Sequence, residues 1–212
     1  MSNLPPFLQN NQLHKVCLIV EGYEEYFYFD KLLQFPCFQG TYSIKPINAK
    51  TASNIPGIYQ AEFSKNIHEV VLVVCDKDRI PTEYNNILAQ LDLILGPGKS
   101  KEVVTFTSPC TLQVILSHFG DVSLTTQAKK AARPIVKELT GVDNYDAHQD
   151  QLHTICSKIH YRTYDEMKNR VRNLSTCPDD IPSTNILLLL ERLESTDTGW
   201  ISEINDNLSE DN

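Results

Sequence analysis

Two aspartates follow the most apolar segment of the chain. Residues 70–75 are apolar without interruption, and Asp76, Lys77 and Asp78 come directly after them. An apolar run of this length predicts a buried strand, which would bring both carboxylates to one edge of a sheet. Such a pair either holds a cation or forms an ordinary polar turn, because aspartate is common where a strand ends.

A second acidic group follows an earlier apolar run. Residues 15–20 lead into Glu21, and Glu25 lies one helical turn further on. Ligands of an open parallel sheet bind outside the carboxyl ends of its strands, so two neighbouring strands would bring these acids together. The candidate catalytic residues are therefore Glu21, Glu25, Asp76 and Asp78.

A metal ion is the natural partner of such a group. Clustered carboxylates repel one another and raise one another's pKa unless a cation neutralises them. Mg²⁺ or Mn²⁺ is expected, because these hard cations prefer oxygen ligands, and the predicted ligands are Glu21, Asp76 and Asp78. A metal in this place can activate a water molecule and stabilise both oxygens of a phosphodiester displacement.

A sheet is needed to position these acids. Apolar runs of strand length alternate with segments of helical period through residue 107. Alternation of this kind predicts an α/β fold with a four-stranded, mostly parallel sheet and helices on both faces. The expected strands are 15–20, 42–48, 69–75 and 101–107, with Pro46 suited to an edge strand. The expected helices between them are 23–34, 53–66, with a serine cap and Pro56 in its first turn, and 82–95.

The second half of the chain has the apolar spacing of helices. We expect an α/β domain over residues 13–107, a helical region over 108–208 packed on it, and flexible termini at 1–12 and 209–212. Pro134 is expected to interrupt one helix, because proline removes a backbone hydrogen bond. Ser183 with Asn185 is expected to cap the last helix.

Charge is distributed unevenly. The net charge is −8, yet residues 175–212 hold one basic residue and nine acidic ones, so the rest of the chain is neutral. The acidic segment either covers the site or, by default, solvates the surface. The basic residues expected to contact a phosphate are Lys77, Arg79, Lys129 and Lys130, and for each a solvent-facing role is the alternative.

Two features bear on the compartment. No apolar run approaches the roughly 18 residues that a membrane span requires, so we expect no membrane contact and a cytoplasmic protein. The six cysteines show no paired or metal-ligand spacing, so we expect reduced, mostly structural thiols and no zinc site.

The acidic motifs carry a family resemblance. A strand that ends in Glu-Gly, followed by a strand that ends in Asp-x-Asp, resembles the TOPRIM domain of topoisomerases, primases and OLD-type nucleases. The segment "VEGYEEYFY" is similar to the opening of RloB-like and OLD-type members, with Glu21 and Glu25 matching. Glu24 departs from the pattern, because threonine is usual at that position.

A second match to the RloB-like group follows residue 107. That group tends to show Asn-Pro-Cys-Phe-Glu and then an apolar helix ending in His-Phe, and "SPCTLQVILSHF" keeps the proline, cysteine and His118. Thr111 and Leu112 replace Phe-Glu, so this chain has either lost a functional glutamate or taken one from elsewhere. His118 is either a proton carrier or a hydrogen-bonded structural residue.

The resemblance implies a Mg²⁺- or Mn²⁺-dependent nuclease acting on DNA or RNA, in a group associated with defence against phage. The first alternative is a TOPRIM-like scaffold that binds a protein partner such as an ATPase, which the Thr111-Leu112 replacement and the lack of a strong basic cleft favour. The second is a phosphatase of the haloacid dehalogenase type, in which the first aspartate of Asp-x-Asp attacks phosphorus. Ile80 stands where that motif has threonine or valine, which disfavours it.

Overall fold

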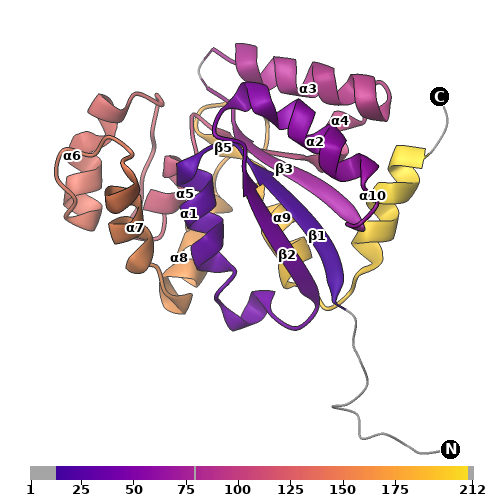
Figure 1. The fold of residues 1–212 in the computed structure, drawn as a ribbon. Helices are drawn as coiled ribbons and strands as arrows, with labels where there is room; N and C mark the ends of the chain where they lie inside the picture. Colours follow the sequence, from indigo (N-terminus) through magenta and orange to yellow (C-terminus); the bar gives the residue numbers. More distant parts are fainter. Residues whose placement is uncertain (1–12, 79, 210–212) are drawn as a thin grey trace, which may run out of the picture.

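A computed structural model of the chain describes residues 13–78 and 80–209. One sheet has the strand order β2-β1-β3-β4-β5 (Figure 1). The strands are β1 (His14–Val20), β2 (Tyr42–Asn48), β3 (Val70–Asp76), β4 (Val104–Ser108) and β5 (Ser183–Thr184). The first four are parallel and β5 is antiparallel to β4. The mostly parallel α/β sheet is confirmed and all four expected strands are present, but the expected count of four is wrong, because a fifth strand, β5, comes from the half expected to be helical.

Helices cover both faces of the sheet. The α-helices are α1 (Tyr23–Leu32), α2 (Ile55–Ser64), α3 (Thr82–Leu95), α4 (Ser100–Val103), α5 (Leu112–Leu116), α6 (Lys129–Thr140), α7 (Gln149–Ser157), α8 (Tyr161–Val171), α9 (Ile186–Glu194) and α10 (Gly199–Ser209), with short 3₁₀ helices η2 (Pro36–Phe38) and η3 (Ala52–Asn54). Helices α2 and α3 pack together on one face, and α1 and α9 lie on the other (Figure 1). The buried side chains of both halves form one hydrophobic core. No helix in the described ranges is long and apolar enough to cross a membrane.

The sheet follows the apolar pattern of the sequence. Strand β3 is central, and its residues up to Cys75 are all buried. Strand β2 lies at the edge of the sheet. Pro46 has no backbone N–H to donate, and an edge strand tolerates this loss better than an interior strand. Helix α3 has the predicted bounds and ends at Gly96, whose φ of 111° few other residues adopt.

Three local expectations need correction. Strand β4 begins three residues later than expected, because the preceding residues form the single turn α4. Pro134 lies inside α6 without ending it, since the buried face formed by Ala132 and Val136 holds the helix together on both sides. Asn185 occupies the N-cap of α9, but its side chain accepts a hydrogen bond from the Phe106 N–H of β4 at 2.8 Å instead of capping the helix.

The acidic C-terminal segment is folded and does not simply solvate the surface. Helix α10 buries Trp200, Ile201 and Ile204, and it extends through Ser209, which we expected to be flexible. The Trp200 indole donates a hydrogen bond to the Tyr42 hydroxyl at 2.7 Å, at the amino end of β2. Helix α10 therefore packs near the amino ends of β2 and β3, away from Glu21, whereas Pro178 and Asp179 of the same segment contact the Lys77 ammonium beside Asp76.

Candidate functional site

Glu21 and Asp76 meet at the carboxyl ends of β1 and β3. These strands are neighbours, with Val20 opposite Val74, so the residues that follow emerge at the same edge of the sheet. The Asp76 backbone N–H donates a hydrogen bond to a Glu21 carboxylate oxygen at 3.0 Å. The pairing of β1 with β3 and this hydrogen bond from the backbone therefore hold the two acids together.

Two threonines orient the Asp76 carboxylate. Its Oδ1 accepts hydrogen bonds from the Thr107 hydroxyl at 2.8 Å, the Thr111 N–H at 2.8 Å and the Thr111 hydroxyl at 2.9 Å. Thr107 lies in β4 and Thr111 is the N-cap residue of α5. One carboxylate oxygen is therefore fixed by the protein, which fixes the direction of the whole group.

The start of α1 supplies two further acids. Glu25 accepts a hydrogen bond from the Gly22 N–H at 2.9 Å, as in a capping box. Glu24 is buried, pairs with the Lys129 ammonium and accepts a hydrogen bond from the Tyr145 hydroxyl at 2.5 Å. Glu24 thus bridges α1 to the region of α6, far away along the chain.

Glu24 was not among the predicted site residues. Potential ligand atoms of Glu24, Asp76 and Cys110 lie within 4.8 Å of one another, close enough to share a metal ion. Glu21 and Asp78 do not belong to this close group in the described part of the chain. In the sequence, Glu24 is distinguished by its departure from the threonine that is usual at this position in RloB-like proteins.

The acids line an open pocket of about 230 Å³. Lys50 and Lys129 line it as well. Its acidic lining residues are Glu21, Glu24, Glu25 and Asp76. The pocket therefore combines an excess of negative charge with two lysine side chains, of which Lys129 is paired with Glu24.

Burial and mutual repulsion shift the acids toward their protonated forms. Burial, followed by the charge of Glu25, raises the pKa of Glu21 to about 7. Burial and the same neighbour raise the pKa of Asp76 well above its usual range, and burial together with Glu24 raises the pKa of Glu25. At neutral pH these groups must hold protons or share a cation, which is the electrostatic condition of many functional sites.

The predicted basic residues are scattered. Lys129 lines the pocket, whereas Lys130 is exposed and outside the described lining. Lys77 is buried and directed toward a loop, where its ammonium contacts the Pro178 carbonyl and lies 3.3 Å from the Asp179 carboxylate. Arg79 lies outside the described residues.

Asp78 and His118 do not line the pocket, although the charge of Asp78 contributes to the raised pKa of Glu21. Asp78 is half-buried, and burial and the charge of Glu83 raise its pKa. His118 is fully buried, and its Nε2 lies 3.0 Å from the Tyr28 hydroxyl. Burial lowers the pKa of His118 to about 3, so the ring is neutral at physiological pH, as expected of a structural histidine.

No family model, curated protein or solved structure matches the chain. The site must therefore be interpreted from its own chemistry.

The donor set suits a hard divalent cation. Carboxylate oxygens predominate, and hard cations prefer them. The thiol within ligand distance of Glu24 and Asp76, that of Cys110, is buried, which raises its pKa well above the ordinary value and keeps it neutral. Lys129 already balances Glu24, so the uncompensated charge rests on Glu21, Glu25 and Asp76.

Proposed function

We propose that this protein is a Mg²⁺- or Mn²⁺-dependent phosphodiester hydrolase of TOPRIM type that acts on DNA or RNA. The observation that carries the proposal is the convergence of four carboxylates on one pocket at the carboxyl ends of two adjacent parallel strands. Ligands of open α/β sheets bind at this edge, and clustered acids with raised pKa values favour a bound cation.

Each residue of the pocket has a definite part in the proposal. Asp76 and Glu24 would hold the metal, and Thr107 and Thr111 orient the Asp76 carboxylate. When bound, a metal there would supply positive charge that activates water and stabilises the phosphate in the transition state. Glu21, with its pKa raised to about 7, takes the proton of the attacking water.

The basic residues complete the substrate site. Lys50 and Lys129 line the same pocket, where their ammonium groups attract the phosphodiester. A neutral protein body can bind a polyanion in this way, because the metal and two local cations provide the attraction. Cytoplasmic defence against foreign nucleic acid, alongside an ATPase partner, is the setting that the RloB-like resemblance implies.

Two departures from the RloB-like pattern, at Leu112 and Glu24, have opposite effects on the number of carboxylates. Leu112, at the position of the usual glutamate, is buried and offers no ligand. Glu24, at the position of the usual threonine, lies within ligand reach of Asp76. Because one acid is missing where another has been gained, the pair supports a site that keeps its number of carboxylates.

Metal binding tests the proposal directly. Calorimetry with Mn²⁺ and Mg²⁺ is expected to show binding to the parent protein and to Asp150→Asn, whose exposed carboxylate lies on α7, but not to Asp76→Asn. Circular dichroism and denaturant unfolding confirm that each variant is folded. Equal binding to all three proteins, or to none at millimolar metal, would reject the carboxylate metal site.

A second candidate function has its own observation. Glu24 is paired with Lys129 and Tyr145, and one oxygen of Asp76 accepts three hydrogen bonds from Thr107 and Thr111, so Glu24 and Asp76 have protein partners without a metal ion. A catalytically inactive scaffold that binds a protein such as an ATPase would have this property. Affinity purification from the native host distinguishes the two: a stoichiometric partner with no metal uptake favours the scaffold.

A further inference from the structure

A second group of metal-ligating side chains lies away from the carboxylate pocket. Cys17 is in β1, Glu62 is near the end of α2, and His68 lies in the loop that leads to β3. Potential ligand atoms of these three residues lie within 4.8 Å of one another. Cys17 and Glu21 are four positions apart along the extended chain, which is about 13 Å, so the two groups cannot share an ion.

The spacing of two of these side chains matches a tetrahedral site. His68 Nε2 and Glu62 Oε2 lie 3.2 Å apart. Nitrogen and oxygen ligands of tetrahedral zinc, each bonded at about 2.0–2.1 Å, lie about 3.3 Å from one another. An ion could therefore replace the hydrogen bond between Glu62 and His68 without a movement of the backbone.

The type of ligand selects the metal. A thiolate, an imidazole and a carboxylate together suit zinc, whereas Mg²⁺ and Mn²⁺ prefer oxygen alone. Lys65 donates to the other oxygen of Glu62 at 2.6 Å, which orients the carboxylate as an outer-shell partner would. The ligand charges of Cys17 and Glu62 would balance a dication.

Two buried polar atoms beside the group have no partner. The Tyr59 hydroxyl and His68 Nδ1 are buried without a hydrogen bond in the described part of the chain. Tyr59 is fully buried, and its pKa is raised by burial and by the charge of Cys17 nearby. Buried polar atoms in native proteins are nearly always satisfied, so a water molecule bound to an ion on His68 Nε2 would account for the unpaired Tyr59 hydroxyl.

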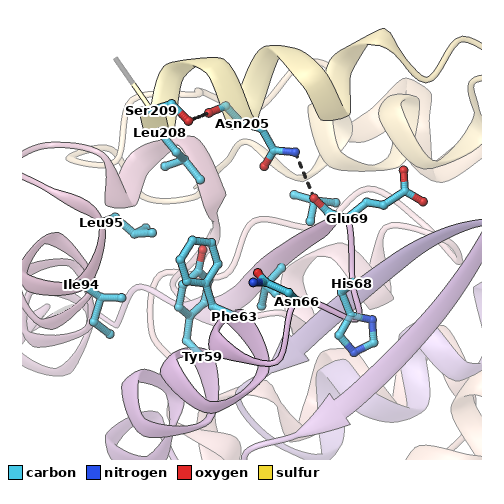
Figure 2. Close-up of a pocket in the computed structure, with 12 residues that line it drawn as sticks. Tyr59, Phe63, Asn66, His68, Glu69, Ile94, Leu95, Asn205, Leu208 and Ser209 are labelled. Atoms are coloured by element: carbon cyan, nitrogen blue, oxygen red, sulfur yellow. Dashed lines mark hydrogen bonds between the residues drawn. The ribbon is translucent and has the colours of Figure 1, made fainter. Parts of the chain in front are cut away.

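A pocket gives access to the group. It measures about 440 Å³, and His68 and Tyr59 line it. Figure 2 shows His68 on the side opposite Ile94 and Leu95, with Asn205 and Leu208 of α10 forming the far wall. Of the three potential ligands only His68 lines this pocket, so an ion would reach the group from the side of its imidazole.

We propose that Cys17, Glu62 and His68 form a zinc site with a water molecule as its fourth ligand. Three protein ligands and an exchangeable fourth are typical of zinc sites that bind water or a small ligand. Binding releases the thiol proton of Cys17 to solvent. Burial alone raises the pKa of Cys17 to about 12, and a bound dication reverses that preference.

Cobalt substitution tests the ligand set without any assay of activity. Titration of the metal-free protein with Co²⁺ is expected to give a stoichiometric thiolate-to-cobalt charge-transfer band, which Zn²⁺ then abolishes. Cys17→Ser is expected to lose this band. Cys110→Ser is expected to keep it, and this variant is the matched control because Cys110 is the thiol that lies beside the carboxylate pocket.

A second variant keeps the test valid if Cys17→Ser does not fold. His68→Asn changes a loop residue and is expected to weaken Zn²⁺ binding at least about 100-fold by calorimetry, because a direct ligand matters no less than its outer-shell partners. His153→Asn, on the exposed face of α7, is expected to bind as the parent does. Absence of the band in the parent, its loss in Cys110→Ser, or unchanged Zn²⁺ affinity in His68→Asn would overturn the site.

Discussion

The carboxylate pocket lies just beyond the carboxyl end of β1, whereas Cys17 of the Cys17–Glu62–His68 group lies in the middle of that strand, and the two groups differ in charge. The pocket gathers four acids against two lysines, so it lacks positive charge. The second group holds one acid, and Lys65 and His68 both contact it. The pocket would attract a cation through its charge, whereas the second group would select one through its ligand types.

The shifts in pKa express the same contrast. Burial and neighbouring acids raise the pKa values of Glu21, Glu25 and Asp76. The hydrogen bond from Lys65 lowers the pKa of Glu62. The acids of the carboxylate pocket therefore tend to hold protons, whereas Glu62 tends to be ionised, although both groups lie against the same sheet. The difference arises from the burial and the charged neighbours of each carboxyl group.

The largest expected effect is on catalysis at the pocket. Asp76→Asn is expected to lower Mn²⁺-dependent hydrolysis of single-stranded DNA or RNA at least about 1000-fold, because metal stabilisation of the reacting phosphate contributes several kcal/mol. Initial rates on labelled oligonucleotides measure the effect, with Asp150→Asn as the control. Equal rates in the two variants would remove Asp76 from the mechanism and weaken the contrast between the two groups.

The next prediction compares the loss of stability when each of the buried acids Glu24 and Glu62 loses its lysine partner. Lys129→Met leaves Glu24 buried without its charge partner and is expected to lower the free energy of unfolding by about 3 kcal/mol. Lys65→Met is expected to cost at most about 1 kcal/mol, because Lys65 is 51% exposed and Glu62 keeps His68.

Urea unfolding at pH 7 measures both values. Lys130→Met, next to Lys129 but exposed, is expected to change the free energy of unfolding by less than about 0.5 kcal/mol. A larger loss for Lys65→Met than for Lys129→Met would show that charge compensation matters more in the second group, which reverses the comparison.

The features that could be predicted from the sequence are those that depend on the residues of one strand or one helix. The uninterrupted apolar run before Asp76 marks a central strand, and the run before Glu21 marks its neighbour. Helix α3 has the bounds that its period and the following glycine indicate. Such features are visible in the sequence, because burial on both faces requires a continuous apolar segment.

The missed features depend on contacts between distant residues. Strand β5 has two residues, too few to show the alternation of apolar and polar residues that marks a strand in a sequence. Glu24 is buried because Lys129 and Tyr145, more than a hundred residues further on, supply its partners. Helix α10 does carry an amphipathic spacing, but the acidic composition around Trp200 obscured it.

A smaller effect distinguishes the groups by pH. Folded Glu21 keeps its proton to about pH 7, whereas an unfolded glutamate loses it near 4.5. The folded state therefore binds more protons between these values, so the free energy of unfolding is expected to fall by about 2 kcal/mol as pH rises from 4.5 to 7. The lowered pKa of Glu62 acts in the opposite sense, and its stabilisation is lost as pH falls below 4.5.

Urea unfolding between pH 4.5 and 8, with a chelator present, measures this dependence. Glu21→Gln is expected to flatten the decline, whereas Glu203→Gln, an exposed change on α10, leaves it in place. Stability that rises over the same interval in the parent would mean that Glu21 is ionised and already paired.

The smallest effect concerns how firmly the pocket holds its acids. Thr111→Val removes the hydroxyl that donates to Asp76 but keeps the backbone N–H bond, so it is expected to cost about 1 kcal/mol of unfolding free energy. It is also expected to raise the pKa of Asp76 further, since one donor to the ionised form is lost. Thr105→Val, buried in the same region without a hydroxyl bond to these acids, is the control, and its change should stay within about 0.5 kcal/mol. Thermal or urea unfolding measures the difference, and Mn²⁺ calorimetry across pH follows the carboxylate. If the two valine variants behave alike, Thr111 merely fills space and Asp76 is oriented by its metal, as a ligand in the Cys17–Glu62–His68 group would be.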